Sequence, residues 1–261
     1  MSRPGGRPPS PPADGQVCAL VAVDIAGFTR PDRDNDIRRY LHEELYRVLQ
    51  KAFDGSGIPW ASCCHEDRGD GVLIVVPPGI TGKGIIDPLP ERLRNLIRLH
   101  NHVCRSAAGI QLRAAAHIGP VDHDGHGFIG SDIDFLFRML EARPLKRALT
   151  SSGPELALIV SDYVHVNVVC RYPSLVSPDA FRPVRFQVKY TRARAWVYLP
   201  GTSSPSAAYL PHEAITPEAA RLCQGPPGQR IADPEDPDVA SWHDRSMSAS
   251  GPPPRCFVTK R

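Results

Sequence analysis

The sequence predicts an α/β fold, an α+β sandwich in which a strand, a helix and a β-hairpin follow one another. Residues 17–23 form a short run of apolar side chains, as in a strand that is buried on both faces. Apolar residues then recur at helical spacing between residues 37 and 52. Two more apolar runs, at 60–65 and 72–76, flank a tight turn at 68–71 and predict a β-hairpin.

The second half of the domain continues the alternation of helix and strand. Pro88 and Pro90 precede a predicted helix whose apolar face runs from residue 93 to residue 107. A predicted strand at 110–118 completes the order βαββαβ, which is that of a ferredoxin-like, palm-type core. The later predicted elements are a helix at 129–140 and strands at 156–160, 181–188 and 195–199.

Proline-rich tails flank the predicted domain. Residues 1–16 and 201–261 are rich in Pro, Gly and Ser, and much of the chain's total of 28 prolines falls there. We therefore expect a disordered tail at 1–16, one domain at 17–200 and a mostly irregular tail at 201–261. A short helix is expected within the second tail, at 217–223.

Composition and charge narrow the functional classes. Hydrophobic residues make up 41% and charged residues 23% of the chain, which suits a core that needs no disulfides. The net charge of +3 gives no reason to expect a nucleic-acid partner. Seven cysteines without zinc-site spacing indicate reduced thiols and a cytoplasmic location. No apolar run reaches the roughly 20 residues of a membrane helix, so no membrane association is expected.

Two aspartates carry the predicted chemistry. Asp24 ends the first strand, and the glycine-containing turn that follows places the backbone N–H groups of residues 25–28 where they can bind phosphate oxygens. Asp70 lies at the tip of the hairpin, next to the first strand in this topology. Two adjacent carboxylates suit Mg²⁺ or Mn²⁺ when substrate phosphates supply further ligands. The alternative for each aspartate is a plain role in forming its turn.

Four motifs in this order resemble the catalytic domain of class III nucleotide cyclases, the adenylyl and guanylyl cyclase superfamily. Residues 24–29 resemble the family's D-I-x-G-F-T motif, and residues 69–71 resemble its G-D-G hairpin. Residues 113–121 match an R-x-x-x-H-x-G-P-V segment, and residues 130–138 match G-x-x-V-N-x-A-x-R in part. The resemblance covers roughly residues 17–200 and indicates a divergent, bacterial-type member.

The resemblance implies a reaction and a set of ligands. Two ions of Mg²⁺ or Mn²⁺ would bridge a nucleoside triphosphate at each site. The ribose 3′ oxygen would attack the α-phosphate and release pyrophosphate, which leaves a 3′,5′-cyclic monophosphate. The metal positions would be Asp24, Ile25 and Asp70, and the nucleotide would lie beside Gly27, Phe28 and Thr29.

Further catalytic residues also follow from the resemblance. The family works as head-to-tail dimers, so Arg138 would reach the phosphate in the site of a partner within a homodimer. Lys189 resembles the family's late phosphate-binding lysine, and the alternative is a solvated strand lysine. Asp134 stands where the family has a transition-state asparagine, so an acceptor replaces a donor. Loss of an oriented donor lowers rates by about 10²–10³ in comparable sites.

The resemblance places two base-reading positions at Glu66 and Gly127. Glutamate four residues before the second aspartate goes with guanine in the family, and a carboxylate also accepts from the exocyclic amine of cytosine. We therefore expect a substrate other than ATP, either GTP or a pyrimidine nucleotide. Compact bacterial cyclases that make cyclic pyrimidine nucleotides in anti-phage signalling resemble this layout too. The alternative for Glu66 is an exposed strand residue without a role in recognition.

Other functions stay open at this point. Asp134, with the bulky Leu136 and Phe137 where the family has small residues, fits a catalytically degenerate cyclase-like domain. Such a domain would bind nucleotide or a partner protein and act as a signalling module. A palm-type nucleotidyltransferase is a weaker alternative, because the hairpin has no glycine-glycine-acidic turn. The basic run at 143–147 is expected on a solvated face, with phosphate binding as the minor alternative.

Overall fold

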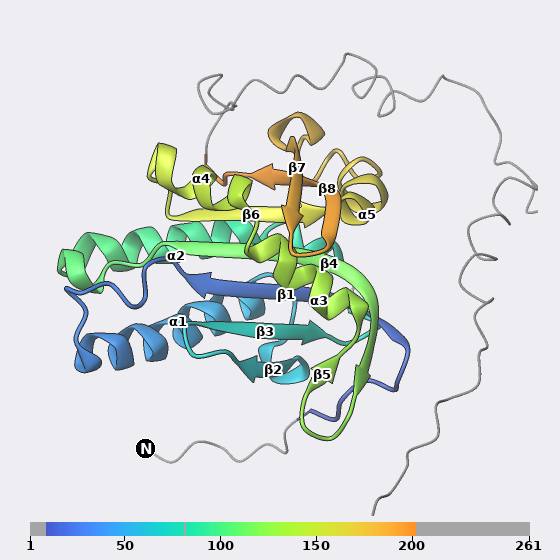
Figure 1. The fold of residues 1–261 in the computed structure, drawn as a ribbon, viewed down its shortest axis with the longest axis horizontal. Coiled ribbons are helices and arrows are strands. Elements are labelled where there is room, and N and C mark those ends of the chain that lie inside the picture. Colours follow the sequence, from blue (N-terminus) through green and yellow to red (C-terminus); the bar gives the residue numbers. More distant parts are fainter. Residues whose placement is uncertain (1–8, 81, 202–261) are drawn as a thin grey trace, which may run out of the picture. The chain divides into compact units, whose positions relative to one another are not determined.

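An eight-stranded sheet forms the centre of the molecule (Figure 1). The computed structural model describes residues 9–80 and 82–201. The strand order is β2-β3-β1-β4-β6-β8-β7, and β5 pairs with β4 beside this path. The pairing of β4 with β6 is parallel. The strands are β1 (Gln16–Ile25), β2 (Cys64–Asp67), β3 (Gly71–Val76), β4 (Leu112–His123), β5 (Phe128–Ile129), β6 (Leu156–Ser161), β7 (Arg182–Val188) and β8 (Thr191–Tyr198).

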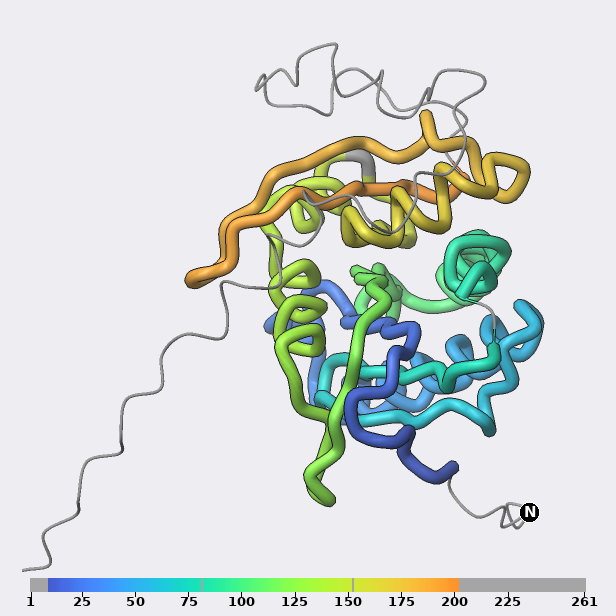
Figure 2. The backbone as a smooth tube through the Cα atoms, turned by 90° about the vertical axis from the view of Figure 1, so that its right-hand side faces the viewer, coloured from blue at the N-terminus to red at the C-terminus, as the bar shows by residue number. Residues whose placement is uncertain are grey.

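Helices cover both faces of this sheet, and Figure 2 shows α1 and α2 on one side and α3 on the other. Buried residues of α1 and α2 form one hydrophobic cluster with the sheet, whereas those of α3 and α4 belong to a second cluster. The side chain of Asp34 caps the start of α1 by accepting the N–H of Ile37 at 2.8 Å. The helices are α1 (Asn35–Gly55), α2 (Leu89–Val103), α3 (Ser131–Leu140), α4 (Arg143–Ser152) and the short α5 (Asp162–Val164).

We call the face of the sheet that packs against α3 and α4 the α3/α4 face, and the two hydrophobic clusters the α1/α2 cluster and the α3/α4 cluster. The alternation of side chains along each strand decides which of them lie on the α3/α4 face. In β1, Val21 and Val23 belong to the α1/α2 cluster and Ala22 to the α3/α4 cluster. Because successive side chains in a strand point to opposite faces, Asp24 projects to the α3/α4 face. Ala115 and Ile159 also belong to the α3/α4 cluster and Cys64 packs against it, so the residues two positions away from them in the same strands point to the same face. Four of these residues are polar, one in β2, two in β4 and one in β6. These positions are Glu66, Arg113, His117 and Ser161.

The predicted order of strands and helices is confirmed, and the main omission was α4. Its buried residues follow a helical pattern, but basic residues stand between them. Pro144 also reads as a helix breaker, although it stands in the first turn, where proline is tolerated. The predicted strand at 60–65 begins only at Cys64, because residues 60–62 form a 3₁₀ turn.

Two residues of the predicted N-terminal tail form hydrogen bonds with β4. Within the predicted tail, the N–H of Gly15 donates to Asp122 Oδ1 at 2.7 Å, and Asp14 Oδ1 accepts the N–H of His123 at 3.1 Å. All described residues belong to one compact unit. The helix predicted at 217–223 lies outside the described residues. None of the helices in the described ranges has the length and apolar character needed to cross a membrane.

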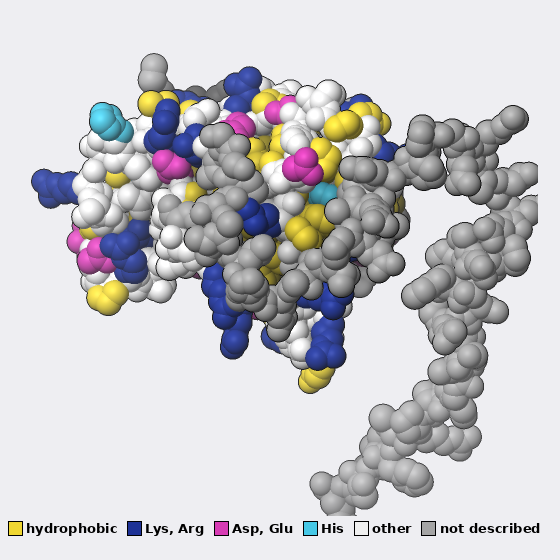
Figure 3. All heavy atoms as spheres, turned by 90° about the horizontal axis from the view of Figure 1, so that it is seen from above, with side chains coloured by type: hydrophobic (Ala, Val, Ile, Leu, Met, Phe, Trp, Pro, Cys, Tyr) yellow, Lys and Arg dark blue, Asp and Glu magenta, His cyan; other side chains and the backbone are white. Residues whose placement is uncertain are grey.

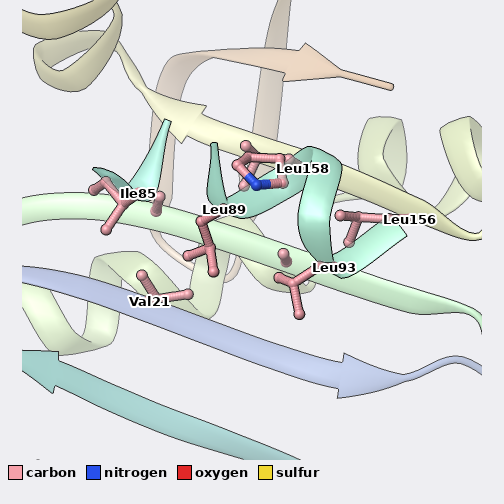
Figure 4. Close-up of a pocket in the computed structure, with 9 residues that line it drawn as sticks. Val21, Ile85, Leu89, Leu93, Leu156 and Leu158 are labelled. Atoms are coloured by element: carbon pink, nitrogen blue, oxygen red, sulfur yellow. The ribbon is translucent and has the colours of Figure 1, made fainter. Parts of the chain in front are cut away.

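A small cavity lies between α2 and the sheet (Figure 4). Its volume is about 10 Å³, far below the roughly 300 Å³ of the smallest usual ligand pockets. Its lining is apolar and includes Val21, Leu89, Leu93 and Leu158. This cavity is therefore a packing gap of the core and has no room for a nucleotide.

Candidate functional site

Asp24 and Asp70 meet where β1 and β3 pair. Asp24 is the register partner of Gly71, and the N–H of Ile25 donates to the carbonyl oxygen of Asp70 at 2.9 Å. The negative charge of Asp70 is one cause that raises the pKa of Asp24. The structure thus brings together the two aspartates that the hairpin topology placed side by side.

Arg113 of β4 holds Asp24 from the other side of β1. Its Nε donates to Asp24 Oδ1 at 2.7 Å and a terminal nitrogen donates to Oδ2 at 2.8 Å. Both side chains are less than a fifth exposed, at 17% for Arg113 and 16% for Asp24. Burial raises the pKa of Asp24 to about 6 and outweighs the lowering by Arg113. Sequence reasoning missed this role, although Arg113 opens a recognised motif and pairs with Asp24 in register.

The donor set of the two aspartates fits a hard divalent cation. Carboxylate oxygens are the ligands that Mg²⁺ and Mn²⁺ prefer, and a cation would offset the repulsion between the two charges. Within the described part of the chain, no group of three or more His, Cys, Asp or Glu side chains could hold a metal. The pair therefore suits an ion that takes its remaining ligands from substrate oxygens and water, as Mg²⁺ does in nucleotide sites.

The turn after Asp24 differs from the phosphate-binding loop that the sequence predicted. The N–H of Ile25 binds Asp70, that of Ala26 binds the carbonyl oxygen of Gln111 at 2.9 Å, and that of Phe28 binds the carbonyl oxygen of Ile25 at 3.3 Å. Three of the four predicted phosphate donors are thus engaged within the chain, because the turn closes on β3 and β4. Gly27 is exposed and has a positive φ of 64°.

The rest of this turn divides between core and solvent. Phe28 packs against the α1/α2 cluster, whereas Thr29 is exposed. Gly27 and Thr29 are therefore the parts of the predicted nucleotide contact that face solvent, and their contact with nucleotide stays a prediction.

Glu66 and Gly127, the two expected base-reading positions, also come together. Glu66 Oε1 accepts the N–H of Phe128, and Oε2 accepts from Arg68 at 2.5 Å. A Cβ atom at Gly127 would lie 2.8 Å from Glu66 Oε1. The side chain of Glu66 is only 20% exposed, so the alternative of a fully solvated strand residue does not hold. The missing side chain at position 127 is what lets the carboxylate reach the backbone of β5.

Arg68 links this carboxylate to α3. Its guanidinium carbon lies 5.0 Å from the centre of the Phe137 ring, within the range of a cation–π contact. Phe137 is one of the bulky residues that depart from the family pattern, and the structure gives it a packing role against the hairpin turn. The turn that carries Asp70 is therefore connected to α3 through Arg68.

Asp134 and Arg138 lie one turn apart on α3 and so share a side of the helix. Asp134 is exposed and Arg138 is half-buried. Neither side chain forms an ion pair with another described residue. Action of Arg138 in the site of a second protomer stays a prediction, and this geometry leaves the side chain available for it.

Lys189 lies in the turn between β7 and β8, directly after the strand, so the alternative of a strand lysine does not hold. Its φ is 52°, a left-handed value that is rare for lysine. Lys189 and the neighbouring Tyr190 are exposed at the tip of this hairpin. Figure 3 shows Lys and Arg side chains in several places on the side of the molecule that is seen from above. The role of Lys189 in binding phosphate stays a prediction.

Gly71 is expected to be intolerant of any side chain. A Cβ atom there would lie 2.1 Å from the carbonyl oxygen of Val23 and 3.0 Å from Asp24 Cα. We expect Gly71→Ala to lower the free energy of unfolding by about 1–3 kcal/mol, the usual range for overpacking. Urea denaturation would measure this. The control is Gly82→Ala, whose Cβ would make an ordinary contact at 3.4 Å with Ile118. Equal losses in both variants would contradict the steric explanation.

The chain is similar to several solved structures of nucleotide cyclases. No known protein-family model and no curated protein matches the sequence. An adenylate/guanylate cyclase/hydrolase from Silicibacter pomeroyi superposes with a TM-score of 0.52 and 19% identity, covering 72% of this chain and 98% of that chain. The catalytic core of a rhodopsin-guanylyl cyclase with converted specificity, bound to ATPαS, gives a TM-score of 0.48 and 15% identity over 70% of this chain and 95% of that chain.

A guanylate cyclase domain from Catenaria anguillulae, solved with GTP, gives a TM-score of 0.44 and 16% identity over 71% of this chain and 98% of that chain. At these identities a superposition establishes a fold and not an activity, and the first comparison carries that conclusion. The described domain of this chain has the class III nucleotide cyclase fold.

Proposed function

We propose that this protein is a nucleotide cyclase that converts a nucleoside triphosphate into a 3′,5′-cyclic monophosphate and pyrophosphate. The observation that carries the proposal is the position of Asp70 beside Asp24, where the N–H of Ile25 donates to the carbonyl oxygen of Asp70 and Arg113 holds the carboxylate of Asp24. The fold supports it, because a solved structure with this fold is described as an adenylate/guanylate cyclase/hydrolase. We further propose a head-to-tail homodimer that uses Mg²⁺ or Mn²⁺ in cytoplasmic signalling, with anti-phage defence as one such role.

The proposed chemistry needs little covalent work from the protein. Mg²⁺ or Mn²⁺, when bound, would supply Lewis-acid stabilisation of the triphosphate and a lower pKa for the attacking 3′ hydroxyl. Asp24 and Asp70 would hold the ions, and Arg113 keeps the carboxylate of Asp24 in one orientation through its two hydrogen bonds. Arg138 and Lys189 would place positive charge against the phosphate, with Arg138 reaching the site of the partner.

The proposed substrate is GTP or a pyrimidine nucleotide. Each oxygen of Glu66 retains acceptor capacity beyond the bonds from Phe128 and Arg68, so it can accept from an N–H group of guanine or from the exocyclic amine of cytosine. The absence of a side chain at Gly127 lets the carboxylate of Glu66 lie against the backbone there, so a base would be read by Glu66 and not by residue 127. A discrimination of about 10²-fold or more against the wrong base would be ordinary for a site that recognises N–H groups.

A binding module is the second candidate function, and particular observations favour it. Asp134 is an exposed acceptor where the resembling family has a donor, and three amides of the turn after Asp24 are already engaged. The cation–π contact of Phe137 with Arg68 also occupies space beside the hairpin turn. A domain of this kind would bind nucleotide and signal through conformation without turnover.

One experiment separates the two functions. Purified full-length protein is incubated with each of the four ribonucleoside triphosphates and Mn²⁺, and mass spectrometry follows pyrophosphate and cyclic monophosphates. A cyclic product that requires Mn²⁺ establishes the cyclase and names its base. Nucleotide binding by calorimetry without any product over a long incubation would establish the binding module in its place.

Restoration of the family asparagine tests whether Asp134 is a catalytic defect. Asparagine provides an oriented N–H donor and removes a negative charge beside the phosphate, so we expect Asp134→Asn to raise kcat by about 10²-fold. Asp134 is exposed, so the substitution should leave the melting temperature unchanged. Initial rates at saturating nucleotide would measure the change. A fall in kcat would mean that Asp134 itself takes part in the reaction.

A further inference from the structure

A chain of three polar side chains, two of them buried, joins the first turn of α3 to the sheet. His117 of β4 lies between them, with Nε2 at 2.8 Å from Asp132 Oδ1 and Nδ1 at 2.8 Å from Ser161 Oγ. His117 is 7% exposed and Ser161 is 1% exposed. Ser161 Oγ also accepts the N–H of Val164 at 3.2 Å and so caps α5. The chain therefore connects α3, β4, β6 and α5 beneath the helix that carries Asp134 and Arg138.

The hydrogen bonds of this chain agree with one tautomer of the imidazole. Ser161 Oγ accepts from Val164, so its O–H is available to donate to His117 Nδ1. His117 Nε2–H then donates to the carboxylate of Asp132. Every donor finds an acceptor in this arrangement, and no buried polar atom of the three side chains is left unpaired, as stable buried networks require.

The backbone around the chain is shaped to admit the carboxylate. A Cβ atom at Gly119 would lie 2.3 Å from Asp132 Oδ1, so only glycine lets Asp132 reach His117. The ring of His117 also meets that of Phe135 edge to face, with the ring centres 5.2 Å apart. Two consecutive turns of α3 therefore contact the same histidine, one through a charged hydrogen bond and one through packing.

We propose that His117 and Asp132 are positioning residues that set the orientation of α3, and with it the presentation of Asp134 and Arg138. The proposal rests on the proposed cyclase function for its catalytic consequence, but the orientation itself can be tested without turnover. The nearby Ser161 is too deeply buried to act as a nucleophile, so the chain serves geometry and not hydrolysis.

The first arm of the test measures α3 directly. Hydrogen–deuterium exchange of the full chain should become several-fold faster at residues 131–140 in Asp132→Ala, with α1 unchanged as the internal control. Asp132→Asn keeps an oxygen that accepts from Nε2–H and should retain slow exchange. Gly119→Ala should reproduce Asp132→Ala, because the added methyl group displaces the carboxylate. Nitrogen-15 spectra of the wild-type imidazole should show the Nε2–H tautomer.

The second arm measures the catalytic consequence. We expect Asp132→Ala to lower kcat by up to about 10²-fold, the usual effect of a misplacement near 1 Å, with little change in KM. Asp132→Asn should restore most of the rate. In mixed dimers, Asp132→Ala protomers should restore activity to Asp70→Ala protomers, because one protomer then supplies an intact Asp70 and the other an intact α3. They should not restore activity to Arg138→Ala protomers, because α3 is then defective in both protomers. Asp179→Ala, an exposed aspartate outside the site, should have wild-type exchange and rate.

The two arms separate the possible failures. Unchanged exchange in both Asp132→Ala and Gly119→Ala would overturn the proposal, whatever the activity. Faster exchange in a protein without cyclase turnover would uphold the positioning of α3 and reject the proposed function alone. Loss of rate in Asp132→Asn equal to that in Asp132→Ala, with slow exchange retained in both, would also overturn it, because the charge and not the orientation would then matter.

Discussion

Replacement of Asp70 by alanine is expected to lower the rate of cyclic-nucleotide formation by about 10³-fold or more. Metal coordination stabilises the transition state of such reactions by several kcal/mol, and each 1.4 kcal/mol of activation free energy changes the rate about tenfold. Asp70 is exposed, and its backbone carbonyl is what binds β1, so the fold should persist. Product formation at saturating Mn²⁺ would measure the rate, and thermal unfolding would confirm the fold. Wild-type activity in this variant would refute the metal assignment.

Asp24→Ala should lose activity to the same degree but should also lose stability. Removal of the Asp24 carboxylate takes away the acceptor of two hydrogen bonds from Arg113, whose side chain is only 17% exposed. A buried donor left unpaired costs about 1–3 kcal/mol, and a charged donor costs more. The two variants thus form a matched pair, in which activity falls in both and the free energy of unfolding falls in one. Asp179→Ala serves as the control that should retain both properties.

Arg138→Ala is expected to lower kcat by about 10²–10³-fold, because the arginine would face the charge that develops on the phosphate. If Arg138 acts in the partner's site, a mixture of Arg138→Ala and Asp70→Ala protomers should regain activity. Random exchange of protomers makes half of the dimers mixed, each with one intact site, so about a quarter of wild-type activity should return. Initial rates of the equilibrated mixture would measure this.

The control for this mixture is each variant alone at the same total concentration. No recovery, with mixed dimers demonstrated by native mass spectrometry, would mean that Arg138 acts within its own chain. The half-buried side chain of Arg138 would then have to turn toward Asp70 of its own protomer. Either outcome locates the site relative to the two protomers.

The sequence by itself predicted the sheet that places the aspartates. Apolar runs and tight turns report local conformation, so the order from β1 to β4 and the hairpin at Asp70 followed from pattern alone. Strand pairing then made Asp24 and Asp70 neighbours. The helix α4 was not predicted, because basic residues and Pro144 interrupt the helical spacing of its apolar residues in the sequence.

Only the tertiary structure showed which long-range contacts form around the site. The pairing of Arg113 with Asp24 joins residues 89 positions apart, and the contact of Glu66 with Phe128 joins residues 62 positions apart. Whether the amides after Asp24 bind phosphate or the chain's own carbonyl groups likewise depends on how the turn closes on β3 and β4. Local pattern carries no information on such choices, because strand register and side-chain packing across the whole sheet decide them.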